Sequence, residues 1–150
     1  AIIRLNLIAP INISQVANRI MQKQDSGGTI INIASVSTIR PSPGTAAYGA
    51  AKAGLVNLTG SLAVEWAPKV RVNSIIAGLT ATEKSLLHYG DEKGIAAISK
   101  TIPLERMATP RDIGNTCLYL SSSLASYVSG ASIEVHGGGE RPAYLNAPNS

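Results

Sequence analysis

The stretch SVSTIRPSPGTAAYGAAKAG, residues 35–54, joins a short apolar run to a long segment rich in alanine and leucine. Within it, Tyr48 and Lys52 stand four residues apart among alanines and glycines. If the segment is helical, the two side chains lie on one face, with Cβ atoms roughly 6 Å apart. The small neighbours leave room for another surface to come close. The pattern therefore predicts either a packed surface pair or a small site.

Helix-like and strand-like patterns alternate on either side of this stretch. Apolar residues at helical spacing predict a helix over residues 5–23, with Pro10 near its start. A second helix is expected over Thr45–Trp66, and a third is expected to begin at the cap sequence Thr109-Pro110. Short apolar runs predict three strands, Thr29–Ala34, Val70–Ile76 and Ala131–Val135.

This order of elements favours an α/β fold. Strands that alternate with helices pair in parallel through right-handed crossovers. With about three strands and three long helices, the chain is expected to form part of a doubly wound, Rossmann-like parallel sheet. The strand at 29–34 is apolar on both faces, so it is expected to have a neighbour on each side.

Composition excludes several classes of protein. The 150 residues are 45% hydrophobic and 15% charged, which is typical of one globular domain with a buried core. The net charge of +4 comes from basic residues scattered singly, so a nucleic-acid partner is not expected. No apolar run approaches the roughly 18 residues of a membrane span. Cys117 is the single cysteine, which excludes an internal disulfide and fits a cytoplasmic location.

Ser35, Tyr48 and Lys52 together resemble the Ser…Tyr-x-x-x-Lys active site of the short-chain dehydrogenase/reductase family. Further segments are similar to family segments in the same order: GGTIINIASV, AAYGAAKAGLVNLTGSLAVEWAP, VRVNSI, MATPRDIGNTCLYLSS and SYVSGASIEVHGGG. The resemblance covers all but about the last dozen residues. It implies that residues 1–136 form the C-terminal, catalytic half of the domain and that 137–150 form a loose tail.

The resemblance implies a role for each of four residues in interconverting a ketone and a secondary alcohol. Tyr48 would be the general acid/base, and Lys52 would hold the nicotinamide ribose. Ser35 would hydrogen-bond the substrate oxygen, and Asn6, in LNLIAP, would support a water-linked proton relay. A free tyrosine has a pKa of about 10 and is a poor base at neutral pH. An ammonium roughly 6 Å away favours the phenolate by about 2–3 kcal/mol at an effective dielectric near 20.

Structural explanations of the same residues stay open at this point. A Tyr/Lys pair at this spacing is most often a surface contact worth a few tenths of a kcal/mol. Ser35 alone could cap the following segment. Asn6 alone could be a surface asparagine.

The loop AGLTATE, residues 77–83, lies where the family contacts its cofactor. The resemblance implies that Gly78, Thr80 and Thr82 meet NAD or NADP. Ala77 replaces the usual proline, so the loop is expected to be less rigid. The residue that would separate NAD from NADP does not occur in the matched segments.

Other features limit what the resemblance implies. The family's opening strand, Gly-rich turn and helix, which cradle the pyrophosphate, find no match in these residues. A second reading is therefore an inactive, truncated remnant that acts only as an oligomerisation or binding module. Homo-oligomers are common in the family. No metal site is expected, because His88 and His136 lack a ligand set.

The substrate is expected to be a small carbonyl compound or alcohol. Its identity is expected to depend on the variable stretch Glu83–Lys100, where Leu86, Leu87 and Ile98 suggest a partly apolar molecule.

Overall fold

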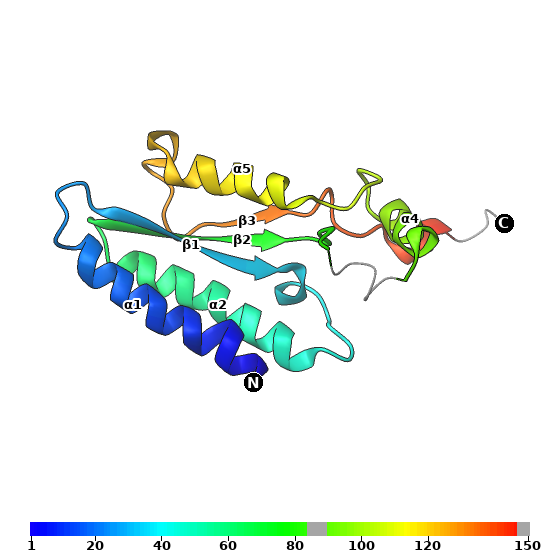
Figure 1. The fold of residues 1–150 in the computed structure, drawn as a ribbon, viewed down its shortest axis with the longest axis horizontal. Helices are drawn as coiled ribbons and strands as arrows, with labels where there is room; N and C mark the ends of the chain where they lie inside the picture. Colours follow the sequence, from blue (N-terminus) through cyan, green and yellow to red (C-terminus); the bar gives the residue numbers. More distant parts are fainter. Residues whose placement is uncertain (84–89, 147–150) are drawn as a thin grey trace.

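A computed structural model describes residues 1–83 and 90–146 and contains one parallel sheet. Its strands are β1 (Gly28–Ser35), β2 (Val70–Ala77) and β3 (Ser132–Val135), in the order β1-β2-β3. Helices α1 and α2 cover one face of the sheet, and α5 covers the other (Figure 1). The predicted α/β class and the three predicted strands are confirmed.

The helices follow the sequence signals closely, with one irregular start. The helical elements are η1 (Arg4–Ile8, a π-helical turn), α1 (Ala9–Met21), η2 (Val36–Thr38), α2 (Ala46–Glu65), α4 (Glu92–Thr101), α5 (Pro110–Ser121), η3 (Ser123–Ala125) and η4 (Ala143–Asn146). Thr45 and Trp66 flank α2 as its caps. The helix expected over 5–23 is instead a π-helical turn that continues directly into α1, so Pro10 lies just after the junction, inside a continuous helical segment.

The strand register brings three loops together at one edge of the sheet. Ser35 at the end of β1 pairs with Ala77 at the end of β2, which pairs with Val135 at the end of β3. The segments that follow the three strands therefore start side by side. In doubly wound folds this carboxyl edge is where ligands bind.

Two apolar layers hold the helices on the sheet. On the α2 side, Leu62 and Trp66 pack against Val70 and Val72 of the second strand. On the α5 side, Leu120 is fully buried against the sheet. Hydrophobic burial of this kind stabilises a fold by roughly 25 cal/mol per Å² of apolar surface.

The apolar stripe expected on the first helix is present, but described residues do not cover it. Ile13, Val16 and Ile20 are 68%, 56% and 58% exposed. Strand β1 pairs only with β2 among the described residues, although a neighbour on each side was expected. Within the described ranges, no helix has the length and hydropathy needed to cross a membrane.

The segment after His136 is not loose as far as it is described. A Cβ at Gly137 would lie 2.9 Å from Ile102 Cγ2, and the Gly137 carbonyl accepts a 3.1 Å hydrogen bond from the Leu104 amide. Glu140 then forms an ion pair with Arg40. The sequence missed this packing because its partners are remote in the chain.

Helix α5 begins with a reciprocal cap centred on Asp112. The Asp112 carboxylate accepts from Arg106 at 2.8 and 3.0 Å and from the Thr109 amide at 2.7 Å. The Arg106 hydrogen bond, followed by those from Thr109, holds the pKa of Asp112 well below its usual range. The carboxylate therefore stabilises the folded state above the pKa of an unfolded aspartate, about 4, and this stabilisation is lost as the pH falls further.

We therefore expect Asp112→Asn to lower the melting temperature at pH 7, with a smaller difference from the parent protein at pH 3. Thermal unfolding followed by circular dichroism measures both. Asp25→Asn, which removes an exposed carboxylate with no partner among the described residues, is the matched control. An Asp112→Asn effect of the same size at both pH values would contradict this account of the cap.

Candidate active site

Lys52 joins the helix that carries it to the end of the first strand. Its ammonium donates a 2.8 Å hydrogen bond to the Ile33 carbonyl of β1 and lies 5.7 Å from the centroid of the Tyr48 ring. Tyr48 and Lys52 lie one turn apart on α2 and face the same way, as their spacing predicted. The ammonium thus sits between the phenol and the strand that ends at Ser35.

The environment of Lys52 affects its charge. Partial burial lowers the pKa of its amine, because desolvation disfavours the charged form. An ammonium has three N–H donors, and only the bond to Ile33 is formed among the described residues. Hydrogens therefore remain for a ligand that approaches this face of α2.

Ser35 ends β1 and caps the short turn η2. Its Oγ accepts a 3.2 Å hydrogen bond from the Ser37 amide. Ser35 therefore does cap the segment that follows it, as one structural explanation expected. The cap uses an oxygen lone pair and leaves the hydroxyl hydrogen available as a donor. Ser35 is half-buried, so its hydroxyl is not sealed inside the core.

The turn after Ser35 packs against the start of α2. A Cβ at Gly49 would lie 3.0 Å from the Ser37 carbonyl oxygen, so a larger residue beside Tyr48 would push the turn away. Ser42 hydrogen-bonds the Ser37 hydroxyl at 3.3 Å. These contacts hold the turn after Ser35 and the start of the Tyr48 helix together.

Asn6 lies in the π-helical turn at the beginning of the chain and makes a local hydrogen bond. Its Nδ2 donates to the Ile2 carbonyl at 3.1 Å. The same turn packs on α2, since a Cβ at Gly54 would lie 3.1 Å from Leu7 Cδ2. π-Helical turns are rare and occur frequently at functional sites. Asn6 thus lies in a turn that contacts α2, without a hydrogen bond to Ser35 or Lys52.

The loop after β2 is held by contacts with the end of β3 and with Ala108. A Cβ at Gly78 would lie 2.7 Å from His136 Cα, so the end of β3 already requires a glycine there. Thr80 Oγ1 donates to the Gly78 carbonyl at 3.1 Å, and Thr80 forms a β-bridge with Ala108. Thr82 is exposed. The loop is thus tied at several points, despite the alanine that replaces the usual proline.

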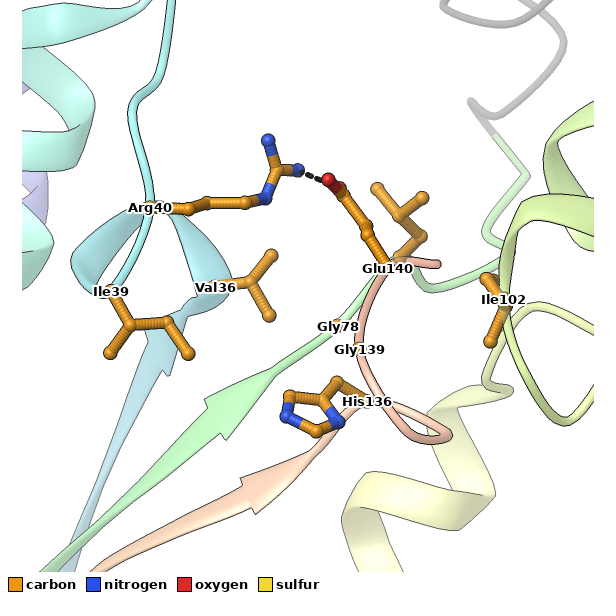
Figure 2. Close-up of a pocket in the computed structure, with 9 residues that line it drawn as sticks. Val36, Ile39, Arg40, Gly78, Ile102, His136, Gly139 and Glu140 are labelled. Carbon is orange, nitrogen blue, oxygen red and sulfur yellow. Dashed lines mark ion pairs between the residues drawn. The ribbon is translucent and has the colours of Figure 1, made fainter. Parts of the chain in front are cut away.

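A cavity of about 260 Å³ opens at the carboxyl edge of the sheet (Figure 2). It begins at Val36, the residue after Ser35, and includes Gly78 at the end of β2. Ser35, Tyr48 and Lys52 themselves do not line it.

The sequence predictions did not include the ion pair across this cavity. Arg40 Nη2 lies 2.9 Å from Glu140 Oε1, and the two residues are 100 positions apart in the sequence (Figure 2). No local pattern could reveal a pair so distant in sequence. The available signal was a charged residue in the Pro/Ser-rich loop directly after the predicted active-site serine.

Comparison with known proteins identifies the family. The family described as Enoyl-(Acyl carrier protein) reductase matches residues 1–140. The chain is 39% identical over 137 residues to 3alpha-hydroxysteroid dehydrogenase of Mediterraneibacter gnavus, covering 91% of this chain and 54% of that protein. It is 35% identical over 138 residues to 2-dehydro-3-deoxy-D-gluconate 5-dehydrogenase of Escherichia coli, with the same coverage.

A solved structure agrees with these relatives. That of 4-hydroxyisoleucine dehydrogenase complexed with NADH superposes with a TM-score of 0.83 at 33% identity, covering 91% of this chain and 56% of that one. The chain spans about half the length of the curated relatives it matches. The match over nearly all described elements, in sequence and in fold, shows that the chain belongs to the short-chain dehydrogenase/reductase family.

Proposed function

We propose that this chain supplies the acid/base half of an oxidoreductase that interconverts a ketone and a secondary alcohol with NAD or NADP. The observation that carries the proposal is the position of the Lys52 ammonium, between the Tyr48 ring and the strand that ends at Ser35. A positive charge beside the Tyr48 ring suits the role of Tyr48 as the group that exchanges a proton with the substrate.

The described residues fit a nicotinamide cofactor at this edge of the sheet. Lys52 has N–H donors left for ribose hydroxyls, and the solved relative named above holds NADH. Gly78, Thr80 and Thr82 follow β2 where doubly wound folds bind nucleotides, and we propose that they contact the cofactor. The cofactor, when bound, supplies or accepts the hydride.

The chain's own residues then handle the oxygen of the substrate. Ser35 donates its hydroxyl hydrogen to that oxygen and orients it. Tyr48 gives its proton to the oxygen when the ketone is reduced and takes one when the alcohol is oxidised. Asn6 uses only Nδ2 in its local hydrogen bond, so its Oδ1 is available to accept from a water that returns the proton to solvent.

The wider expectations remain proposals. Assembly into a homo-oligomer is supported by the exposed stripe Ile13, Val16 and Ile20 on α1. That residues 1–136 form a catalytic half and that the protein is cytoplasmic also remain predictions. The reading as an inactive remnant is less well supported, because the relatives are dehydrogenases and the catalytic residues lie in packed, ordered elements. Leu86 and Leu87, expected to shape the substrate site, lie outside the described residues.

We expect the substitution Tyr48→Phe to lower kcat for ketone reduction by at least about 100-fold. The variant is made in the protein as its own cells express it. Affinity for the reduced cofactor should change by no more than a few-fold, because the ring and Lys52 remain. Steady-state kinetics and fluorescence titration of NADH and NADPH measure the two effects. Retention of more than a tenth of kcat would remove Tyr48 from its role as acid/base.

Lys52→Met should weaken cofactor binding and also slow turnover. The loss of the ammonium removes the N–H donors proposed for the ribose hydroxyls and the positive charge beside the Tyr48 ring. Lys52→Arg, which keeps the charge but not the point geometry, should restore part of the turnover. Steady-state kinetics and fluorescence titration of the cofactor measure both effects, and unchanged cofactor affinity and kcat in Lys52→Met would contradict the role proposed for Lys52.

A further inference from the structure

The cavity beside the proposed active site is apolar except at one side. Its apolar walls are Val36, Ile39, Leu79 and Ile102. Arg40 and Glu140 also line the cavity and form an ion pair there, with their side chains 36% and 49% exposed (Figure 2). An ion pair this open to solvent contributes little to the stability of the fold, so replacing one of its partners costs little free energy.

Two residues that line this cavity each carry a buried nitrogen atom without a hydrogen-bond partner among the described residues. The atoms are Arg40 Nε and His136 Nδ1. A buried donor or acceptor without a partner costs free energy, so such atoms are rare in folded proteins and call for an explanation. Both side chains belong to one cavity, so a small rotation of either would let a polar group of a ligand pair with its nitrogen.

The guanidinium of Arg40 is only partly used by its present partner. Glu140 contacts Nη2 and leaves the Nε–H unpaired. A carboxylate lying side-on to a guanidinium accepts from Nε–H and Nη2–H together, in the two-bond geometry that favours arginine at such sites. A ligand carboxylate that takes the place of Glu140, with the Arg40 side chain turned toward the cavity, would therefore satisfy an atom that Glu140 leaves unsatisfied.

His136 adds an acceptor on the same cavity. Its Nε2 lies 2.6 Å from Glu134 Oε2, and because a carboxylate only accepts, this nitrogen carries the hydrogen. Nδ1, on the other side of the ring, is buried and has no partner among the described residues.

We propose that this cavity binds a carboxylate of the substrate, with Arg40 as the residue that determines specificity. Glu140 takes the place of that carboxylate when the cavity is empty. The inference rests on the proposed function and narrows its substrate to a hydroxy or keto acid. Because the cavity begins at the residue after Ser35, the carboxylate lies a short carbon chain away from the reacting oxygen.

The first test is a binding measurement that needs no turnover. In the natively expressed protein with ¹⁵N-labelled arginine, sodium hexanoate should shift the Arg40 Nε–H signal in a saturable way, and methyl hexanoate should not. The signal is assigned by its loss in Arg40→Gln. Glu140→Gln, which removes the competing carboxylate, should lower the hexanoate Kd several-fold. Failure of hexanoate to move the signal in both the parent protein and Glu140→Gln would overturn the proposal.

The second test compares acids with their neutral esters as substrates. For 3-hydroxybutyrate, 4-hydroxypentanoate and 5-hydroxyhexanoate, at least one acid should exceed its methyl ester in kcat/KM by about tenfold or more. Arg40→Gln should raise KM for that acid by about 10- to 100-fold and leave the ester unchanged. The matched control is Arg141→Gln, because Arg141 also pairs with a glutamate, at 3.1 Å, but does not line the cavity.

The two tests separate the two proposals. Saturable hexanoate binding at Arg40 with no oxidation of any acid or ester would support the carboxylate site and count against the proposed function. Turnover of esters and acids at equal rates, or an equal loss for both in Arg40→Gln, would support the function and overturn the carboxylate site.

Discussion

The hydrogen bond from the Lys52 ammonium to the Ile33 carbonyl is the contact on which the proposed site depends. It ties the first half of α2 to the end of β1 and holds the ammonium 5.7 Å from the Tyr48 ring centroid. Gly49 also lets the turn after Ser35 lie against α2, because a Cβ there would lie 3.0 Å from the Ser37 carbonyl oxygen. Both contacts hold the end of β1 against the first half of α2.

Local signals in the sequence were sufficient for most of the fold. The cap sequence at Thr109 located the start of α5, helical spacing of leucines located α2, and short apolar runs located the strands. The spacing of Tyr48 and Lys52 correctly placed them on one helical face. These features depend on neighbours within a turn or two, where sequence patterns carry physical information.

Features that depend on distant parts of the chain were not predicted. The Arg40–Glu140 ion pair and the packing of Gly137 on Ile102 join segments with no local pattern in common. The π-helical turn around Asn6 also went unpredicted, because its residues have the same apolar spacing as an ordinary helix. The resemblance implies that Gly78 meets the cofactor, and the structure adds a separate reason for a glycine there, because a Cβ would lie 2.7 Å from His136 Cα at the end of β3.

We separate two parts of the proposed site: the residues Ser35, Tyr48 and Lys52, and the cavity beside them. The relatives that the chain matches bear names that point to a steroid, a sugar acid and an amino acid, so the fold alone does not choose the substrate. We therefore propose that side chains around the cavity select the substrate, and in this chain those are apolar walls with Arg40, Glu140 and His136.

The central claim is that this site passes hydride between a nicotinamide and a carbon that bears oxygen. It is tested most directly by incubating the natively expressed protein with stereospecifically 4-deuterated NADH or NADPH and a panel of keto acids and simple ketones. Mass spectrometry of the alcohols should find one deuterium on the carbinol carbon from one face of the nicotinamide only. Oxidised cofactor without deuterium in any alcohol, or no oxidation with any ketone, would contradict the account.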